Sequence, residues 1–111
     1  MNQNTVEPKD KNELLLTQLI LMFQTAAFQH MGKMKNPLTD KVEQDLTQAQ
    51  ISIDMLEMIH TKMKGNLAPE EERIFSTVLQ ELRLNFVDEA LKVQASQQKT
   101  SSSPSDPKPT P

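Results

Sequence analysis

Three stretches of the chain place apolar residues at the three- and four-residue spacing typical of an amphipathic α-helix. They predict helices over about residues 13–34, 45–64 and 69–91. A rival start for the second helix is Asp40 with Glu43. The short links, at about residues 35–44 and 65–68, favour antiparallel packing of consecutive helices. The pattern therefore predicts an all-α, up–down–up three-helix domain.

The residues at the ends of the second and third helices support this assignment. Asp45 and Gln48 match a capping box, in which each residue satisfies a free N–H group at the helix start. Gly65 stands where a left-handed residue ends a helix. Pro69 is suited to a first helical position, and the glutamates at 70–72 place negative charge at the positive end of the helix dipole.

The first predicted helix is apolar around most of its circumference. Its three apolar faces are Leu15, Leu19, Met22, Phe23 and Ala26; then Leu16, Ile20, Ala27 and Met31; then Leu14, Leu21 and Phe28. This is more apolar surface than packing against two neighbouring helices requires. The helix is therefore predicted to be central, or to be buried against another chain or a membrane.

Residues 14–32 contain no formal charge when His30 is neutral, so they must be considered as a membrane span. Only 12 of these 19 residues are apolar, whereas a span needs about 20 predominantly apolar residues. The residues before Leu14 carry three acids and two lysines, unlike the basic start of a secretory signal. We expect a cytoplasmic protein, with membrane association as a less favoured alternative.

Composition divides the chain into a central domain and two polar ends. Residues 1–12 are polar and are predicted to be flexible, and residues 95–111, rich in serine and proline, are predicted to be a disordered tail. The three-helix domain then covers residues 13–94. A domain of this size buries a small fraction of its surface, so self-association is a reasonable expectation.

The overall composition excludes several classes of protein. The chain has 111 residues, only 2 glycines and no cysteine, and its formal net charge is −3. The absence of cysteine excludes a disulfide framework and a Cys-ligated zinc or iron–sulfur site. The scarcity of glycine argues against an α/β nucleotide-binding fold, and the negative charge argues against a general nucleic-acid binder.

The middle of the chain resembles the bacterial domain of unknown function family 1844. The resemblance lies in the segments IDMLEMI at 53–59, KMKGNL at 62–67, EEE at 70–72 and LQELR at 79–83. The upstream AFQHMG at 27–32 and Asn36-Pro37 are also similar to the family. Met63 and Ala68 stand where the family usually has threonine. The resemblance covers about residues 19–89 and implies a bacterial, helical, cytoplasmic protein, without implying an activity.

Few residues suggest catalysis or metal binding. His30 and His60 lie too far apart in antiparallel helices to share one ion, and His60 is expected to be a packed, hydrogen-bonded histidine. Asp54 and Glu57 are three residues apart, with no identifiable partner on a second helix. We therefore predict no catalytic, metal or cofactor site and no small-molecule substrate, and we expect the protein not to be an enzyme.

The leading functional hypothesis is a helical interaction module that binds a second copy or another protein. Six of the seven methionines lie between Met22 and Met63, and methionine is frequent at surfaces that accept helical partners. The predicted contact residues are Leu16, Ile20, Phe23, Met55, Met58 and Ile59. A second predicted contact site, around the turn, comprises Lys62, Lys64, Gly65, Asn66 and Arg83. Contact with RNA or the ribosome through His30, Lys33, Lys35 and Lys41 is a third hypothesis.

Overall fold

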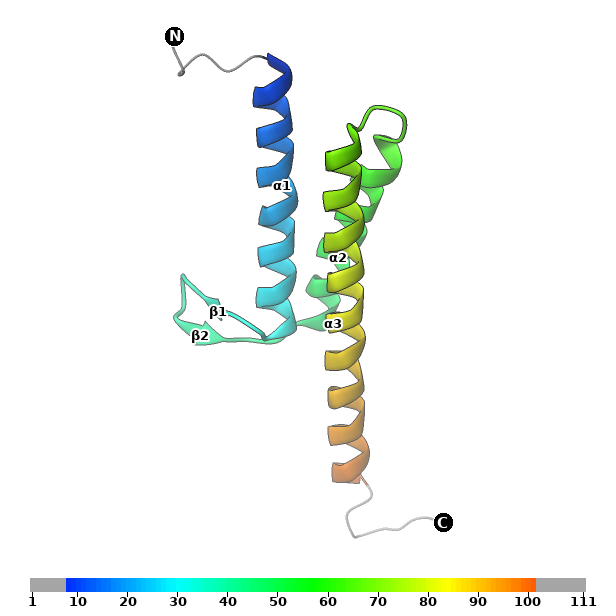
Figure 1. Cartoon of the computed structure of the whole chain (residues 1–111). Helices are drawn as coiled ribbons and strands as arrows, with labels where there is room; N and C mark the ends of the chain where they lie inside the picture. The colour runs from blue at the N-terminus through cyan, green and yellow to red at the C-terminus, as the bar shows by residue number, and fades with distance from the viewer. Residues whose placement is uncertain (1–7, 102–111) are drawn as a thin grey trace.

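The computed structural model describes residues 8–101 and contains three helices and one short hairpin. The elements are α1 (Pro8–Met31), β1 (Lys35–Asn36), β2 (Lys41–Val42), α2 (Leu46–Lys62) and α3 (Pro69–Ser101). Figure 1 shows α1 and α3 running in one direction and α2 running in the opposite direction. The predicted all-α, up–down–up fold is confirmed.

The helices extend beyond the predicted domain of residues 13–94 at both ends. α1 begins at Pro8, because the fixed φ of proline suits the first helical position. α3 continues to Ser101, because lengthening an existing helix does not repeat the cost of nucleation. Residues 8–12 and 95–101 are thus helical, which corrects both predicted boundaries. The rest of the predicted flexible ends, 1–7 and 102–111, lies outside the described residues.

α1 ends at Met31, three residues before its predicted end. Gly32 has a φ of +87°, in the left-handed region that glycine adopts without strain. Its N–H donates to the Gln29 carbonyl at 3.0 Å, and the Lys33 N–H donates to the Phe28 carbonyl at 2.9 Å. These two bonds form a Schellman motif, which satisfies carbonyl groups at the helix end and turns the chain.

A small antiparallel hairpin follows, which the apolar pattern did not predict. Its pairs are Lys35 with Val42 and Asn36 with Lys41. The Asn36 side chain accepts from the Leu38 N–H at 2.8 Å, and its carbonyl accepts from the Asp40 N–H at 2.7 Å. Asp40 lies in the turn with a φ of +58°, so its prediction as a rival start for α2 is wrong. The hairpin projects sideways from the end of α1 (Figure 1).

The predicted N-cap of α2 is confirmed. The Asp45 carboxylate accepts from the Gln48 N–H at 3.1 Å. The Asp45 N–H, which a capping box would assign to the Gln48 side chain, donates instead to the His30 carbonyl at 2.7 Å. This bond holds the start of α2 beside the end of α1.

The turn between α2 and α3 follows the prediction in part: α2 ends at Lys62 with Met63 as its C-cap, so the left-handed Gly65 lies in the turn rather than at the helix end. Gly65 has a φ of +87°, and α3 begins at Pro69. The Ala68 N–H donates to the Glu71 carboxylate at 2.8 Å, so a glutamate of the acidic run satisfies a free donor at the helix start.

The core lies where the three helices meet and contains ten buried hydrophobic residues. They are Ile20, Ala27 and Met31 of α1; Ala49, Ile53 and Leu56 of α2; and Phe75, Val78, Leu79 and Leu82 of α3. Of the three apolar faces of α1, the core therefore uses the second. Ser52, a small polar residue, is buried with them.

Candidate interaction surface

The six predicted contact residues lie at different depths. Ile20 is 1% exposed and belongs to the core, so it is unavailable to a partner and its prediction as a contact residue is corrected. Leu16, Phe23 and Ile59 are partly buried against the core. Met55 and Met58 are exposed. Of the six predicted contact residues, the two methionines are therefore the exposed ones.

Among the described residues, more large hydrophobic side chains are exposed than buried. Fourteen are exposed, against ten buried hydrophobic residues of which two are alanines. Eight of the fourteen lie on the first two helices: Leu14, Leu15, Leu19, Leu21 and Met22 of α1, and Ile51, Met55 and Met58 of α2. Single exposed apolar residues are ordinary, but a group of them on one surface indicates a binding site.

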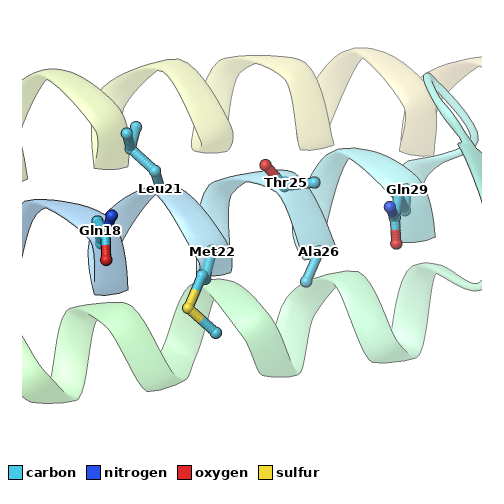
Figure 2. A pocket seen from close by; sticks show the side chains of 6 residues that line it. All are labelled: Gln18, Leu21, Met22, Thr25, Ala26 and Gln29. Carbon is cyan, nitrogen blue, oxygen red and sulfur yellow. The ribbon is translucent and has the colours of Figure 1, made fainter.

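The exposed residues of α1 divide between its two neighbours. Figure 2 shows Leu21 pointing toward α3, whereas Met22 and Ala26 point toward α2. Leu15 and Leu19 precede Met22 by seven and three residues, so they lie on the same side of the helix. The residues Gln18, Leu21, Met22, Thr25, Ala26 and Gln29 together line a shallow depression of about 480 Å³.

On α2, the exposed apolar residues lie on the side away from α3. Glu57 marks the side that faces α3, because its carboxylate binds Arg83 of that helix. Met55 is two residues from Glu57, or about 160° around the helix at 3.6 residues per turn. Ile51 and Met58 lie four residues before and three residues after Met55, so all three share one side.

The two groups lie at the same height in the bundle. The bond between Asp45 and His30 aligns the start of α2 with the end of α1. Counting back along the antiparallel helices from that bond places Met22 level with about residue 53, between Ile51 and Met55. We call this surface the α1–α2 face, and it comprises Leu15, Leu19, Met22, Ile51, Met55 and Met58.

The α1–α2 face is bordered by uncharged residues on α1. Between Leu14 and Gln29 that helix carries no charged side chain, and Gln18 and Thr25 are its exposed polar residues there. Gln24 is turned toward α3, where its amide donates to Glu81 at 2.8 Å. An exposed helix surface that lacks charge is unusual in a small soluble domain, because charged residues normally cover the solvent side of a helix.

His60 is packed and hydrogen-bonded, as predicted. Its Nε2 lies 2.8 Å from the Glu72 carboxylate, and its ring stacks on Phe75 with the centroids 4.9 Å apart. Glu57 pairs with Arg83 across the groove between α2 and α3, at 2.6 Å, rather than along α2 with His60. Glu57 with Arg83 and His60 with Glu72 are thus paired within the chain.

The predicted contact site around the turn is divided between two places. Lys64 and Arg83 line the groove beside His60, whereas Gly65 and Asn66 line a separate shallow depression near the start of α3. Lys62 is exposed in the last turn of α2. The structure therefore does not join these five residues into one surface.

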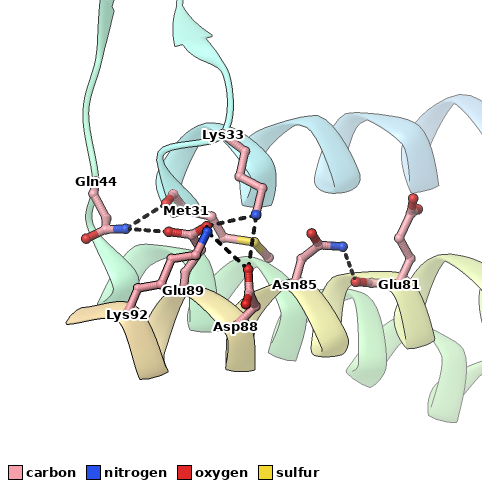
Figure 3. A network of polar contacts seen from close by, with 8 residues as sticks. All are labelled: Met31, Lys33, Gln44, Glu81, Asn85, Asp88, Glu89 and Lys92. Atoms are coloured by element: carbon pink, nitrogen blue, oxygen red, sulfur yellow. Dashed lines mark hydrogen bonds and ion pairs between the residues drawn. The ribbon is translucent and has the colours of Figure 1, made fainter. Parts of the chain in front are cut away.

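A network of charged residues fastens α3 to the link between α1 and α2 (Figure 3). Lys33 lies 2.8 Å from Glu89 and 3.6 Å from Asp88, and Lys92 lies within 3.3 Å of both carboxylates. Gln44 donates to Glu89 at 3.3 Å and to the Met31 carbonyl at 2.9 Å.

The network shifts the pKa values of Glu89 and Lys92, and it includes Lys33 of the segment between α1 and α2. The hydrogen bond from Lys33, aided by Lys92, lowers the pKa of Glu89, and the bond to Glu89 raises the pKa of Lys92. Lys35, in the hairpin, lies 3.7 Å from Asp40. Lys33 and Lys35, two of the basic residues considered for RNA contact, are therefore ion-paired within the chain.

A family model described as a domain of unknown function, DUF1844, matches residues 13–88. The chain belongs to this family. The match confirms the resemblance found in the sequence, and it includes the whole of the α1–α2 face. Neither the curated proteins nor the solved structures yield a match.

Within the DUF1844 domain, sequence reasoning identified Met55 and Met58 but missed four residues of the α1–α2 face: Leu15, Leu19, Met22 and Ile51. Leu15, Leu19 and Met22 had been grouped on one of the three apolar faces of α1. A step of one residue along a helix changes the side on which the side chain lies. Leu19 and Ile20 are adjacent in sequence, yet Leu19 is exposed and Ile20 is buried in the core.

None of the helices within residues 8–101 is both long and apolar enough to cross a bilayer. In that same part of the chain, no group of three or more histidines and carboxylates is arranged to hold a metal ion.

Proposed function

We propose that this protein is a non-enzymatic helical interaction module that binds its partner through the α1–α2 face. The observation that carries the proposal is the gathering of exposed large hydrophobic residues on two adjacent helices, of which α1 carries no charged side chain between Leu14 and Gln29. Burying such residues is the main favourable term in most protein–protein association. The methionines suit this role, because their flexible thioethers adapt to the shape of a partner.

The polar contacts of the fold support the same surface. α3 forms hydrogen bonds or ion pairs with α1, with α2 and with their link. Among residues 10–97, no side-chain hydrogen bond or ion pair joins α1 to α2. A partner that covers the α1–α2 face would therefore meet apolar side chains without having to break polar contacts of the fold.

The proposal is tested with the full chain tagged at its C-terminus and released by gentle lysis. We expect the tagged chain to migrate on a sizing column as part of a complex larger than the 12.6 kDa of the chain itself. The double substitution Met55→Glu/Met58→Glu should release the free chain, because it places two carboxylates in the interface. Circular dichroism checks that the variant retains its helices.

The control is Leu84→Glu, which changes a residue of α3 that is 65% exposed, compared with 46% and 50% for Met55 and Met58. It should leave the complex intact. Migration of the unaltered chain at 12.6 kDa in the lysate, or equal loss of the complex in both variants, would contradict the proposal.

A further inference from the structure

We infer that the α1–α2 face binds a second copy of this chain, so that the two pairs of helices form a four-helix bundle. This inference rests on the proposed function and names its partner. In the dimer, α1 of each copy lies against α2 of the other. Each face is then covered by an identical face, as in interfaces with twofold symmetry.

The spacing of the apolar residues fits this pairing. On α1 the face consists of residues at positions 15, 19 and 22, and on α2 of residues at 51, 55 and 58. Both triads follow the same spacing of four and then three residues, which is the spacing that interdigitates in helix bundles. A twofold rotation therefore brings an α1 triad of one copy over an α2 triad of the other.

The absence of charge on the α1 side of the face favours a second copy over a partner of opposite charge. In an interface with twofold symmetry the groups next to the axis meet their own equivalents, so a charged residue there would face a like charge. The side of α1 that borders the face has Gln18 and Thr25 as its polar residues. An amide and a hydroxyl each donate and accept hydrogen bonds, so both are able to pair with polar groups on α2 of the other copy without placing a charge in the interface.

The size of the face is of the order that a stable dimer requires. α2 has 17 residues, which span about 26 Å at 1.5 Å per residue. Two helices side by side are about 20 Å wide. The footprint is therefore about 500 Å², and its accessible area is larger because the side chains project; a standard interface buries about 800 Å² per partner.

The first test measures the mass of the purified full chain by light scattering and sedimentation equilibrium. Refractive index must report the concentration, because the chain has no Trp or Tyr. We expect twice 12.6 kDa for the unaltered chain and 12.6 kDa for Met22→Glu/Met55→Glu. Leu84→Glu is the control and should remain dimeric, because Leu84 and Met22 are 65% and 66% exposed but only Met22 lies on the face.

A second test identifies which helices meet. Met22→Glu and Met55→Lys are prepared as separate chains and then mixed. Each variant alone should associate at least tenfold more weakly than the unaltered chain. The mixture should recover a heterodimer, since the new carboxylate of one chain meets the new ammonium of the other. Recovery that is no better than either variant alone would overturn the α1-to-α2 pairing.

A third test places no charge in the interface and uses disulfide formation between two copies instead. The chain has no cysteine, so single cysteines introduced by Met22→Cys and Met55→Cys are the only thiols. Oxidation of the mixed variants should give a disulfide-linked heterodimer within minutes, whereas Leu84→Cys mixed with Met22→Cys should give only background cross-linking. Equal cross-linking in both mixtures would overturn the inference.

The outcomes separate this inference from the proposed function. If the purified chain is monomeric at 100 µM and yet a complex in the lysate is lost on Met55→Glu/Met58→Glu, the face binds another protein and only the inference fails. If the monomer instead floats with phosphatidylcholine vesicles, the face binds lipid, and both the inference and the proposed function fail.

Discussion

The contacts that α3 makes differ in kind from the α1–α2 face: the first are polar and paired within the chain, and the second is apolar and exposed. The contacts of α3 end in matched pairs: Gln24 with Glu81, Glu57 with Arg83, and Lys33 with Glu89. The α1–α2 face has apolar side chains that extend into solvent. Polar contacts are directional and are completed within the chain, whereas apolar contacts are non-directional and leave a surface that a partner completes.

The comparison also explains why a domain of this size is expected to associate. Small domains bury a low fraction of their surface and have little stability to spare. Here the shared core is narrow, because each helix contributes only three or four buried hydrophobic residues. Further apolar burial between two copies would add stability that one copy lacks.

The largest expected effect concerns the core that α3 closes. Phe75 is fully buried and stacks on His60. Phe75→Ala should lower the free energy of unfolding by about 3–5 kcal/mol, because it leaves a cavity. Urea unfolding followed by circular dichroism measures the change. The control is Leu38→Ala, because Leu38 is 92% exposed in the hairpin turn. It should change the free energy of unfolding by less than about 0.5 kcal/mol. Similar losses in the two variants would mean that α3 does not close the core.

The helix starts were predictable from sequence, because each depends on a few neighbouring residues. Asp45 caps α2 and Pro69 begins α3, and both roles follow from local backbone chemistry. The hairpin was not predictable, because strands of two residues are too short to show alternation. It depends instead on hydrogen bonds around Asn36 that no periodic pattern reveals.

The buried face of α1 could not be deduced from sequence, because three of its faces are apolar. Ile20 and Leu19 differ little in chemistry, yet Ile20 is buried and Leu19 is exposed. The choice depends on how α2 and α3 dock, which is set by the link at Gly32 and the network around Glu89. Met55 and Met58 were found because their spacing on α2 prevents both from facing the same small core.

The second prediction compares the two turns. Gly32 and Gly65 share a φ of +87°, where an alanine costs about 1–2 kcal/mol. A Cβ at residue 32 would lie 3.3 Å from the Gln44 Cβ, whereas one at residue 65 meets nothing within 4 Å. Gly32→Ala should therefore destabilise the fold more than Gly65→Ala, as measured by urea midpoints. Equal losses would mean that Gln44 moves aside freely and that the link is not tightly held.

The third prediction concerns the pH dependence of the network around Glu89. The hydrogen bond from Lys33 holds the pKa of Glu89 below its ordinary value of 4.5. The folded state thus favours the carboxylate, and this stabilisation is fully present above pH 4.5. It is lost as the pH falls from 4.5 through the folded pKa.

Glu89→Gln should remove this part of the pH dependence. The effect on the free energy of unfolding at pH 7 is expected to be about 1 kcal/mol or less, since the network lies near the surface. Thermal unfolding from pH 3 to pH 7 measures it, and Glu43→Gln is the control because Glu43 is outside the network. An unchanged slope below pH 4.5 in Glu89→Gln would show that Lys33 and Glu89 do not pair in solution.

The smallest expected effect is the coupling between Glu57 and Arg83. Their side chains are 51% and 49% exposed, so water screens the pair although its atoms lie 2.6 Å apart. A double-mutant cycle of Glu57→Gln and Arg83→Gln should give a coupling energy of about 0.5 kcal/mol or less, decreasing with added salt. A salt-independent coupling well above 1 kcal/mol would mean that the groove between α2 and α3 excludes water. In that case the polar contacts of α3 would also be shielded from water, and the contrast between the contacts of α3 and the apolar α1–α2 face would be weaker.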